Sequence, residues 1–150
     1  MKQSKKEIHE AVLFELNNRI SRIESALKSH KEGLLIESNS SAGDKHNTSR
    51  AMMHLEEEKL RTQLSQFSKL NKVLHGINPL IEHNKIRLGS LVNTNKGWLY
   101  ISIPLGKVKI YDLDMMIISL ASPIGKKLQE KTELESFVFN GIKWEIFQVL

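Results

Sequence analysis

Apolar residues recur in alternating steps of three and four positions along the first quarter of the chain. Residues 4–36 contain no proline, and their only glycine, Gly33, lies near the end. An apolar stripe with this spacing is the a/d register of a coiled coil, so it predicts one long helix over 4–36. The stripe consists of Leu13, Leu16, Ile20, Ile23, Leu27, His30 and Leu34.

A second stripe with the same spacing predicts another helix over 48–74. Five of its seven positions are apolar. An apolar stripe is stable only when it is buried against another element. The nearest element is the preceding helix, against which the second helix can pack if the chain folds back antiparallel. We therefore expect a coiled-coil hairpin over 1–77 with a tip near 37–47, where turn-forming residues gather. Asn47, Thr48 or Ser49 is expected to cap the second helix. The second stripe is Met53, Glu57, Leu60, Leu64, Phe67, Asn71 and Leu74.

After Gly76 the pattern shortens to that of strands. Asn78-Pro79 reads as a hinge, because proline stops a helix. Ser122 and Pro123 suit the N-cap and first position of a short helix over 122–128. Alternation predicts that Trp98, Tyr100 and Trp144 help to form a core. The predicted strands are 90–95, 98–103, 107–111, 115–120, 137–140 and 142–149.

These elements predict an α+β fold. An N-terminal antiparallel coiled-coil hairpin over 1–77 is followed by a small, mostly antiparallel β domain with one short helix over 78–150. Asn140-Gly141 is expected to form the turn of the last β-hairpin.

Composition excludes several classes of protein but does not identify the class to which this chain belongs. The chain has no cysteine and a net charge of +5, with 13 basic and 10 acidic residues in 1–77 and 9 and 7 in 78–150. No thiolate metal site or disulfide framework is expected, and no half is charged enough to indicate a DNA-binding arm. No apolar run is long enough for a transmembrane helix, and no signal peptide is expected. A cytoplasmic protein without a membrane partner is expected.

Three segments of the second unit carry a resemblance to a known family. The first is Ile86-x-x-Gly89-Ser90-x-Val92, the second is "IISLASPIGKKLQEK" at 117–131, and the third is "GIKWEIFQVL" at 141–150. Together with the long helical hairpin, they resemble the Gre transcript-cleavage and elongation factors of bacteria. The resemblance covers nearly the whole chain.

The resemblance implies a fold and a mode of action. The C-terminal domain would be FKBP-like and would dock at the rim of the RNA polymerase secondary channel. The docking residues would lie at Ser122, Pro123, Ile124, Gly125 and Lys126. The coiled coil would enter the channel, where acidic tip residues help to hold a catalytic Mg²⁺ that activates water to cut the backtracked RNA 3′ end. The partners implied are core RNA polymerase directly and the nascent RNA 3′ end indirectly, with the factor acting as a monomer.

The tip departs from the family pattern in a way that matters chemically. Mg²⁺ prefers carboxylate ligands, and the family offers Gly-Asp followed by a glutamate three residues on. Here the tip is Gly43, Asp44, Lys45, His46 and Asn47. Asp44 is the candidate catalytic and metal-binding acid, whereas Asn47 supplies only a neutral oxygen and Lys45 adds positive charge. We therefore expect a polymerase-binding factor with reduced or absent cleavage stimulation, which binds no cofactor alone and at most shares Mg²⁺ at the polymerase active centre.

Two other functions remain open from the residues. One is an active cleavage factor that relies on Asp44. The other is a coiled-coil adaptor that does not bind polymerase, in which the hairpin self-associates. Prolyl isomerisation, suggested by fold analogy alone, ranks below both. In the leading interpretation the chain is not itself an enzyme and at most assists RNA cleavage by the polymerase.

Overall fold

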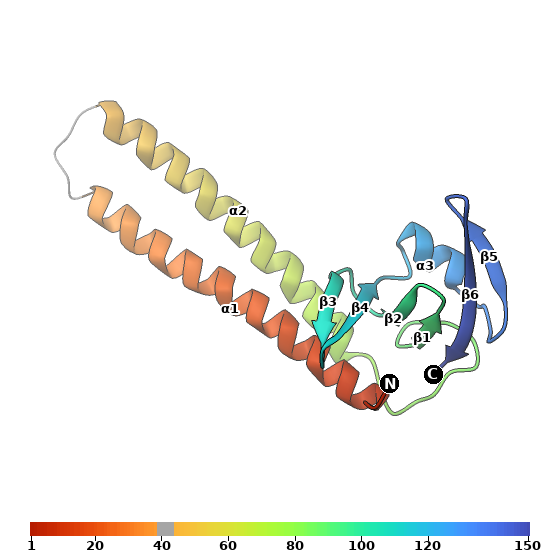
Figure 1. Ribbon diagram of the computed structural model, residues 1–150. Helices are drawn as coiled ribbons and strands as arrows, with labels where there is room; N and C mark the ends of the chain where they lie inside the picture. Colours follow the sequence, from red (N-terminus) through yellow and green to blue (C-terminus); the bar gives the residue numbers. More distant parts are fainter. Residues whose placement is uncertain (39–43) are drawn as a thin grey trace. The chain divides into compact units, whose positions relative to one another are not determined.

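The computed structural model describes residues 1–38 and 44–150, and their side chains apart from those at 34, 37–38 and 44–47 (Figure 1). The two long helices are α1, Lys5–Ser38, and α2, Asp44–His75. Both predicted helices are therefore confirmed. Spatial contacts group the chain into a helical unit, Phe14–Asn71, and a β unit, Met1–Leu13 with Lys72–Leu150. The boundary predicted at residue 78 follows the change of pattern, whereas the contacts also place the first turns of α1 with the β unit.

In the helical unit, α1 and α2 run antiparallel and pack along the predicted stripes. Leu16, Ile23 and Leu27 of α1 are buried, and Met53, Leu60, Leu64 and Phe67 of α2 are partly buried. His30 donates from Nε2 to the Met53 carbonyl oxygen of the facing helix. The polar member of the first stripe is thus satisfied inside the hairpin.

The start of α2 differs from the prediction. The helix begins at Asp44, so Asn47, Thr48 and Ser49 lie inside it and the predicted capping role is wrong. An acidic residue in the first turn is stabilised by the positive end of the helix dipole, which favours a start at Asp44. The segment between the helices is consequently shorter than the predicted tip.

The β unit contains a six-stranded sheet in the order β3-β4-β2-β1-β6-β5. All pairings are antiparallel except that of β2 with β4, which is parallel. The predicted mostly antiparallel sheet with one short helix, α3, is confirmed. The elements are β1 Leu91–Thr94, β2 Gly97–Ile101, β3 Gly106–Ile110, β4 Leu113–Ile118, α3 Pro123–Leu128, β5 Ser136–Phe139 and β6 Ile142–Val149.

Two strand pairs are closed by two-residue turns of the same kind. Asn140 and Gly141 have φ of 50° and 74°, and Tyr111 and Asp112 have φ of 48° and 62°. Two consecutive left-handed residues form the turn whose twist matches that of the strands. Asn140-Gly141 was predicted from its residue types, whereas Tyr111-Asp112 lacks the glycine that marks such turns.

One face of the sheet packs against α3 and holds a hydrophobic cluster. Phe137 and Trp144 are partly buried, stack at 6.0 Å between ring centroids and pack against this core. Tyr100 is fully buried, as predicted, whereas Trp98 is only partly buried. Within the described residues, no helix is long and apolar enough to cross a membrane. The core residues are Ile86, Val92, Leu99, Ile101, Ile118, Leu128, Ile146 and Val149.

Candidate functional site

The predicted tip residues lie where the structure describes little. Gly43 is outside the described residues. Asp44, Lys45, His46 and Asn47 belong by their backbone to the first turns of α2, but their side chains are not described. Their roles as tip contacts, and that of Asp44 as acid and metal ligand, stay predictions. Over the part of the chain that the structure does describe, no group of three or more His, Asp or Glu could hold a metal ion.

The predicted docking residues lie at the start of α3. Two of them, Ser122 and Pro123, are needed to begin this helix. Ser122 caps the helix as predicted, because its Oγ accepts from the Gly125 N–H at 3.0 Å. The same hydroxyl donates to the Ser119 carbonyl oxygen at 2.7 Å. Pro123 occupies the first helical position, where a missing N–H costs nothing. The Ser-Pro pair therefore fixes both the start of the helix and the turn before it.

The fold of the β unit also explains why glycine is found at position 125 and isoleucine at position 124. A Cβ at Gly125 would lie 2.1 Å from the Ser119 carbonyl oxygen, so only glycine fits. Ile124 packs against the core of the β unit. Pro123 and Lys126 are exposed. Of the five predicted docking residues, these two offer the most surface to a partner, and the docking role itself stays a prediction.

The half of the hairpin nearest residues 39–43 exposes large apolar side chains. Two of these residues belong to α1 and two to α2. We call these four residues the distal apolar set. Its members and their exposed fractions are Leu35 (65%), Ile36 (73%), Met52 (67%) and Leu55 (66%).

A groove between the two helices of the hairpin adds positive charge. It encloses about 290 Å³ and is lined by Glu24, Leu27, Lys28, Lys31 and Arg61. Arg61 is also held by Glu57, whose carboxylate lies 2.8 Å from Nη2, and this hydrogen bond lowers the pKa of Glu57. With Arg61 paired to Glu57, Lys28 and Lys31 face one acid of the lining, Glu24, which leaves a small positive surplus at this groove.

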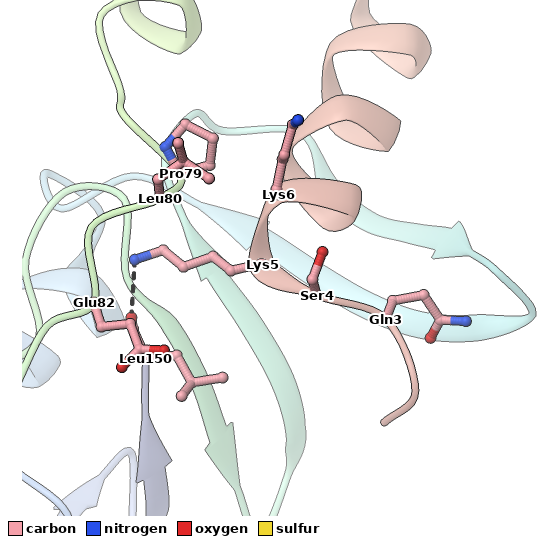
Figure 2. A pocket seen from close by; sticks show the side chains of 8 residues that line it. All are labelled: Gln3, Ser4, Lys5, Lys6, Pro79, Leu80, Glu82 and Leu150. Carbon is pink, nitrogen blue, oxygen red and sulfur yellow. Dashed lines mark hydrogen bonds between the residues drawn. The ribbon is translucent and has the colours of Figure 1, made fainter.

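A second concave site lies in the β unit, at the first turn of α1 (Figure 2). Lys5 is almost completely buried, and its Nζ donates to the carbonyl oxygens of Ile81 at 2.6 Å and Leu150 at 3.2 Å. Burial lowers the pKa of Lys5 to about 8. The adjoining cavity of about 380 Å³ is lined by Gln3, Ser4, Lys5, Lys6, Pro79, Leu80, Glu82 and Leu150. Because Lys5 bonds to two main-chain oxygens, it fastens α1 to the β unit.

A buried polar pair lies one helical turn further along α1. His9 Nδ1 and the Tyr100 hydroxyl are 2.6 Å apart, and both residues are buried. Burial lowers the pKa of His9 and raises that of Tyr100. The pair is a structural contact between helix and sheet, since each polar atom has a partner.

Sequence reasoning missed both Lys5 and His9. A signal was present: Lys5, Ile8, His9, Val12 and Leu16 continue the three-and-four spacing toward the N-terminus. The two polar residues in this run are buried with it.

Comparisons with known proteins were made on the whole chain. No protein-family model matches it, and no curated protein matches its sequence. A solved structure described as "Structure of the transcription factor Gfh1" aligns over 93% of each chain, with 19% identity and a TM-score of 0.35. At this identity and score the alignment assigns no residue role. The class of protein is defined by the helices and strands themselves: an α+β chain with a helical hairpin and a small, mostly antiparallel β unit.

Proposed function

We propose that this protein is a Gre-like transcription elongation factor that binds core RNA polymerase. In this proposal the hairpin enters the secondary channel, and the β unit docks at its rim through the start of α3. Support comes from the two-part layout and from the Ser-Pro-Ile-Gly-Lys motif at 122–126. The chain is not itself an enzyme.

One observation carries the proposal: the hairpin covers its own stripes and still exposes the distal apolar set. Leu16, Ile23 and Leu27 are buried within a single chain, and His30 is satisfied by the Met53 carbonyl. A second copy is therefore not needed to cover the stripe, which argues against a self-associating adaptor. Ile36, Met52 and Leu55 of the distal apolar set lie outside the stripe and are exposed.

The residues near the tip favour regulation over efficient cleavage. Mg²⁺ bound in the polymerase active centre would activate water for hydrolysis of the RNA backbone. This chain offers it one carboxylate, Asp44, because the position three residues on is Asn47. A neutral amide oxygen is a weaker ligand for Mg²⁺ than a carboxylate. Occupation of the channel without strong metal binding would slow or redirect the polymerase.

Binding to core polymerase tests the first part of the proposal. The wild-type chain should bind, and the double variant Ile36→Ser with Met52→Ser should bind at least tenfold more weakly. Phe14→Ser is the matched control, because Phe14 is equally exposed (68%) on the same helix but lies far from residues 39–43. Pro123→Ala with Lys126→Glu should weaken binding independently. No binding by the wild type would reject the proposal.

Transcript cleavage on a backtracked complex tests the second part. We expect little stimulation by the wild type, no further loss in Asp44→Asn, and a gain in Asn47→Glu, which restores a second carboxylate. Polymerase binding should be the same in all three proteins. Strong stimulation by the wild type that is abolished in Asp44→Asn would identify an active cleavage factor instead.

A further inference from the structure

Two methionines stand side by side in α2, and their surroundings differ. Met52 is 67% exposed. Met53 occupies a position of the second apolar stripe and is partly buried. Because the chain has no cysteine, its methionine thioethers are the sulfur groups that an oxidant can attack. The pair therefore allows one oxidation site in the seam of the hairpin to be compared with one outside it.

The side chain of Met53 ends against Gly33 of the facing helix. A Cβ added at Gly33 would lie 3.1 Å from Met53 Cε, which is shorter than the usual contact between carbon atoms. Glycine thus leaves the space that the Met53 methyl group occupies. Glycine inside a helix lowers its stability relative to alanine, so this close packing gives a physical reason for Gly33 within α1.

The main chain of Met53 is held at the same level of the hairpin. His30, three positions before Gly33 and hence on the same face of α1, donates from Nε2 to the Met53 carbonyl oxygen. Met53 is the position of the second stripe nearest residues 39–43. Nearer those residues, the described side chains of Ile36 and Met52 are exposed. The contact with Gly33 therefore lies where the packed part of the seam ends.

Oxidation of Met53 would add a polar atom at this contact. The sulfur lone pair attacks the O–O bond of a peroxide and takes one oxygen. The thioether is thereby oxidised to the sulfoxide, and hydrogen peroxide is reduced to water. The new oxygen is bonded to Sδ, directly beside the Cε that packs on Gly33. A polar group held in an apolar seam without a partner costs free energy, so the oxidised side chain is expected to turn outward to water and leave Gly33.

We propose that Met53 is a site of reversible oxidation by peroxides, and that its sulfoxide loosens the hairpin around residues 28–33 and 50–56. A thiol-dependent methionine sulfoxide reductase would reverse the step, because two thiols are oxidised to a disulfide while the sulfoxide oxygen leaves as water. Oxidation of Met52 should have little effect, since its side chain is already exposed. This inference goes beyond the proposed function and does not depend on it.

The test uses the full chain, hydrogen peroxide and two matched variants. Met52→Leu keeps the methionine in the seam, and Met53→Leu keeps the one outside it. Peptide mass spectrometry measures the oxidation of each methionine, and hydrogen exchange measures the opening of the helices. In oxidised Met52→Leu, exchange at 28–33 and 50–56 should be at least tenfold faster than before treatment and should slow again after the reductase acts. Oxidised Met53→Leu should show no such change.

Two further variants imitate the polar sulfoxide without peroxide. Met53→Gln keeps the length of the side chain and gives it a polar end, so it should speed exchange at 28–33 and 50–56, and peroxide should add little. Met52→Gln is the matched control and should exchange like the wild type. Circular dichroism checks that both variants keep their helices.

The order in which the methionines react tests whether peroxide reaches Met53. Met52 should be oxidised first, because it is the most exposed of the three compared, and the partly buried Met53 should follow. Met115 of β4 is 1% exposed and should react last. Oxidation of Met53 only together with Met115 would show that the seam excludes peroxide, and would overturn the proposal.

Three other results would also overturn it. The first is unchanged exchange after complete oxidation of Met53. The second is equally accelerated exchange in oxidised Met53→Leu, and the third is exchange in Met53→Gln like that of the wild type. None of these measurements involves polymerase, so their failure is distinct from failure of the proposed function.

Discussion

The two units bury their apolar side chains to different extents, although one helix, α1, contributes to both. In the β unit, Ile8 and Val12 are fully buried, and so are Tyr100 and Ile101 on opposite faces of β2. In the helical unit, Ile23 and Leu27 are 9% exposed, and the facing apolar positions of α2 are only partly buried. A strand can be covered on both faces, whereas each helix of a pair is covered along one stripe.

This difference indicates which unit contributes most of the free energy of unfolding and which unit tolerates substitutions. The free energy gained by burial scales with the apolar area removed from water, so most of it belongs to the β unit. The hairpin gains less per residue and can vary its outer faces at little cost. Features that bind a partner, such as the distal apolar set, can therefore change without loss of the fold.

The largest difference in unfolding free energy between the two units should appear when a leucine is truncated to alanine in each of them. Leu128→Ala removes a fully buried core side chain and should cost about 3–5 kcal/mol of unfolding free energy. Leu64→Ala in α2 should cost only about 1 kcal/mol, because the Leu64 side chain is only partly buried in the folded chain. Urea denaturation followed by circular dichroism measures both. Equal losses would show that the hairpin is packed as tightly as the sheet.

A smaller effect is expected at the buried polar pair. Tyr100→Phe leaves His9 Nδ1 without its partner and should cost about 1–3 kcal/mol. Tyr111→Phe is the control, since Tyr111 is 55% exposed on a turn and should lose nothing measurable. Thermal unfolding of the two variants beside the wild type provides the comparison. A neutral Tyr100→Phe would mean that the hydroxyl contributes no net stability.

A third prediction uses pH to isolate the β unit. The pKa of Lys5 falls from 10.5 in the unfolded chain to about 8 in the folded one, chiefly through burial. Between these values the unfolded state holds more protons, so stability rises with pH and is lowest below pH 8. From pH 7 to 9 the gain should be on the order of 1 kcal/mol after allowance for solvent screening.

Variants assign this pH dependence to one residue. Lys5→Met should abolish the rise, whereas Lys6→Met should keep it, because Lys6 is exposed and forms an ion pair with Glu10 at 3.9 Å. Urea midpoints of the three proteins from pH 7 to 9 are the measurement. The same slope in Lys5→Met as in the wild type would assign the effect to another group.

The smallest effect is expected in the hairpin. His30→Leu replaces a polar stripe residue by an apolar one and should stabilise the hairpin by about 0.5 kcal/mol, because a polar residue at such a position costs stability. His54→Leu is the control at an exposed position of α2. Hydrogen exchange of the hairpin amides reports the change. Destabilisation by His30→Leu would show that the bond to Met53 outweighs the apolar gain.

Much of the fold could be predicted from local patterns. The three-and-four spacing gave both long helices, alternation gave the strands, and Ser122 with Pro123 gave the start of α3. The start of α2 was misplaced, because Asn47, Thr48 and Ser49 are common capping residues and their residue types do not reveal that the helix already began at Asp44.

Features that depend on distant contacts were beyond local patterns. The parallel pairing of β2 with β4 depends on the connection through β3, and His9 meets Tyr100 across 91 positions. Of the candidate site, the capping role of Ser122 is confirmed, and the roles of Asp44 and of the docking surface stay predictions. Both roles depend on contacts with a partner molecule, and the pattern of residues in one chain does not determine such contacts.

The close fit of Gly125 has a consequence for genetics. Every replacement there adds at least a Cβ, which would lie 2.1 Å from the Ser119 carbonyl oxygen. Position 125 should thus tolerate no allele in a saturation mutagenesis screen, whereas the exposed Lys126 beside it should tolerate many. Two adjacent codons would then evolve at very different rates: one constrained by the fold of the chain, and the other only by whatever it binds.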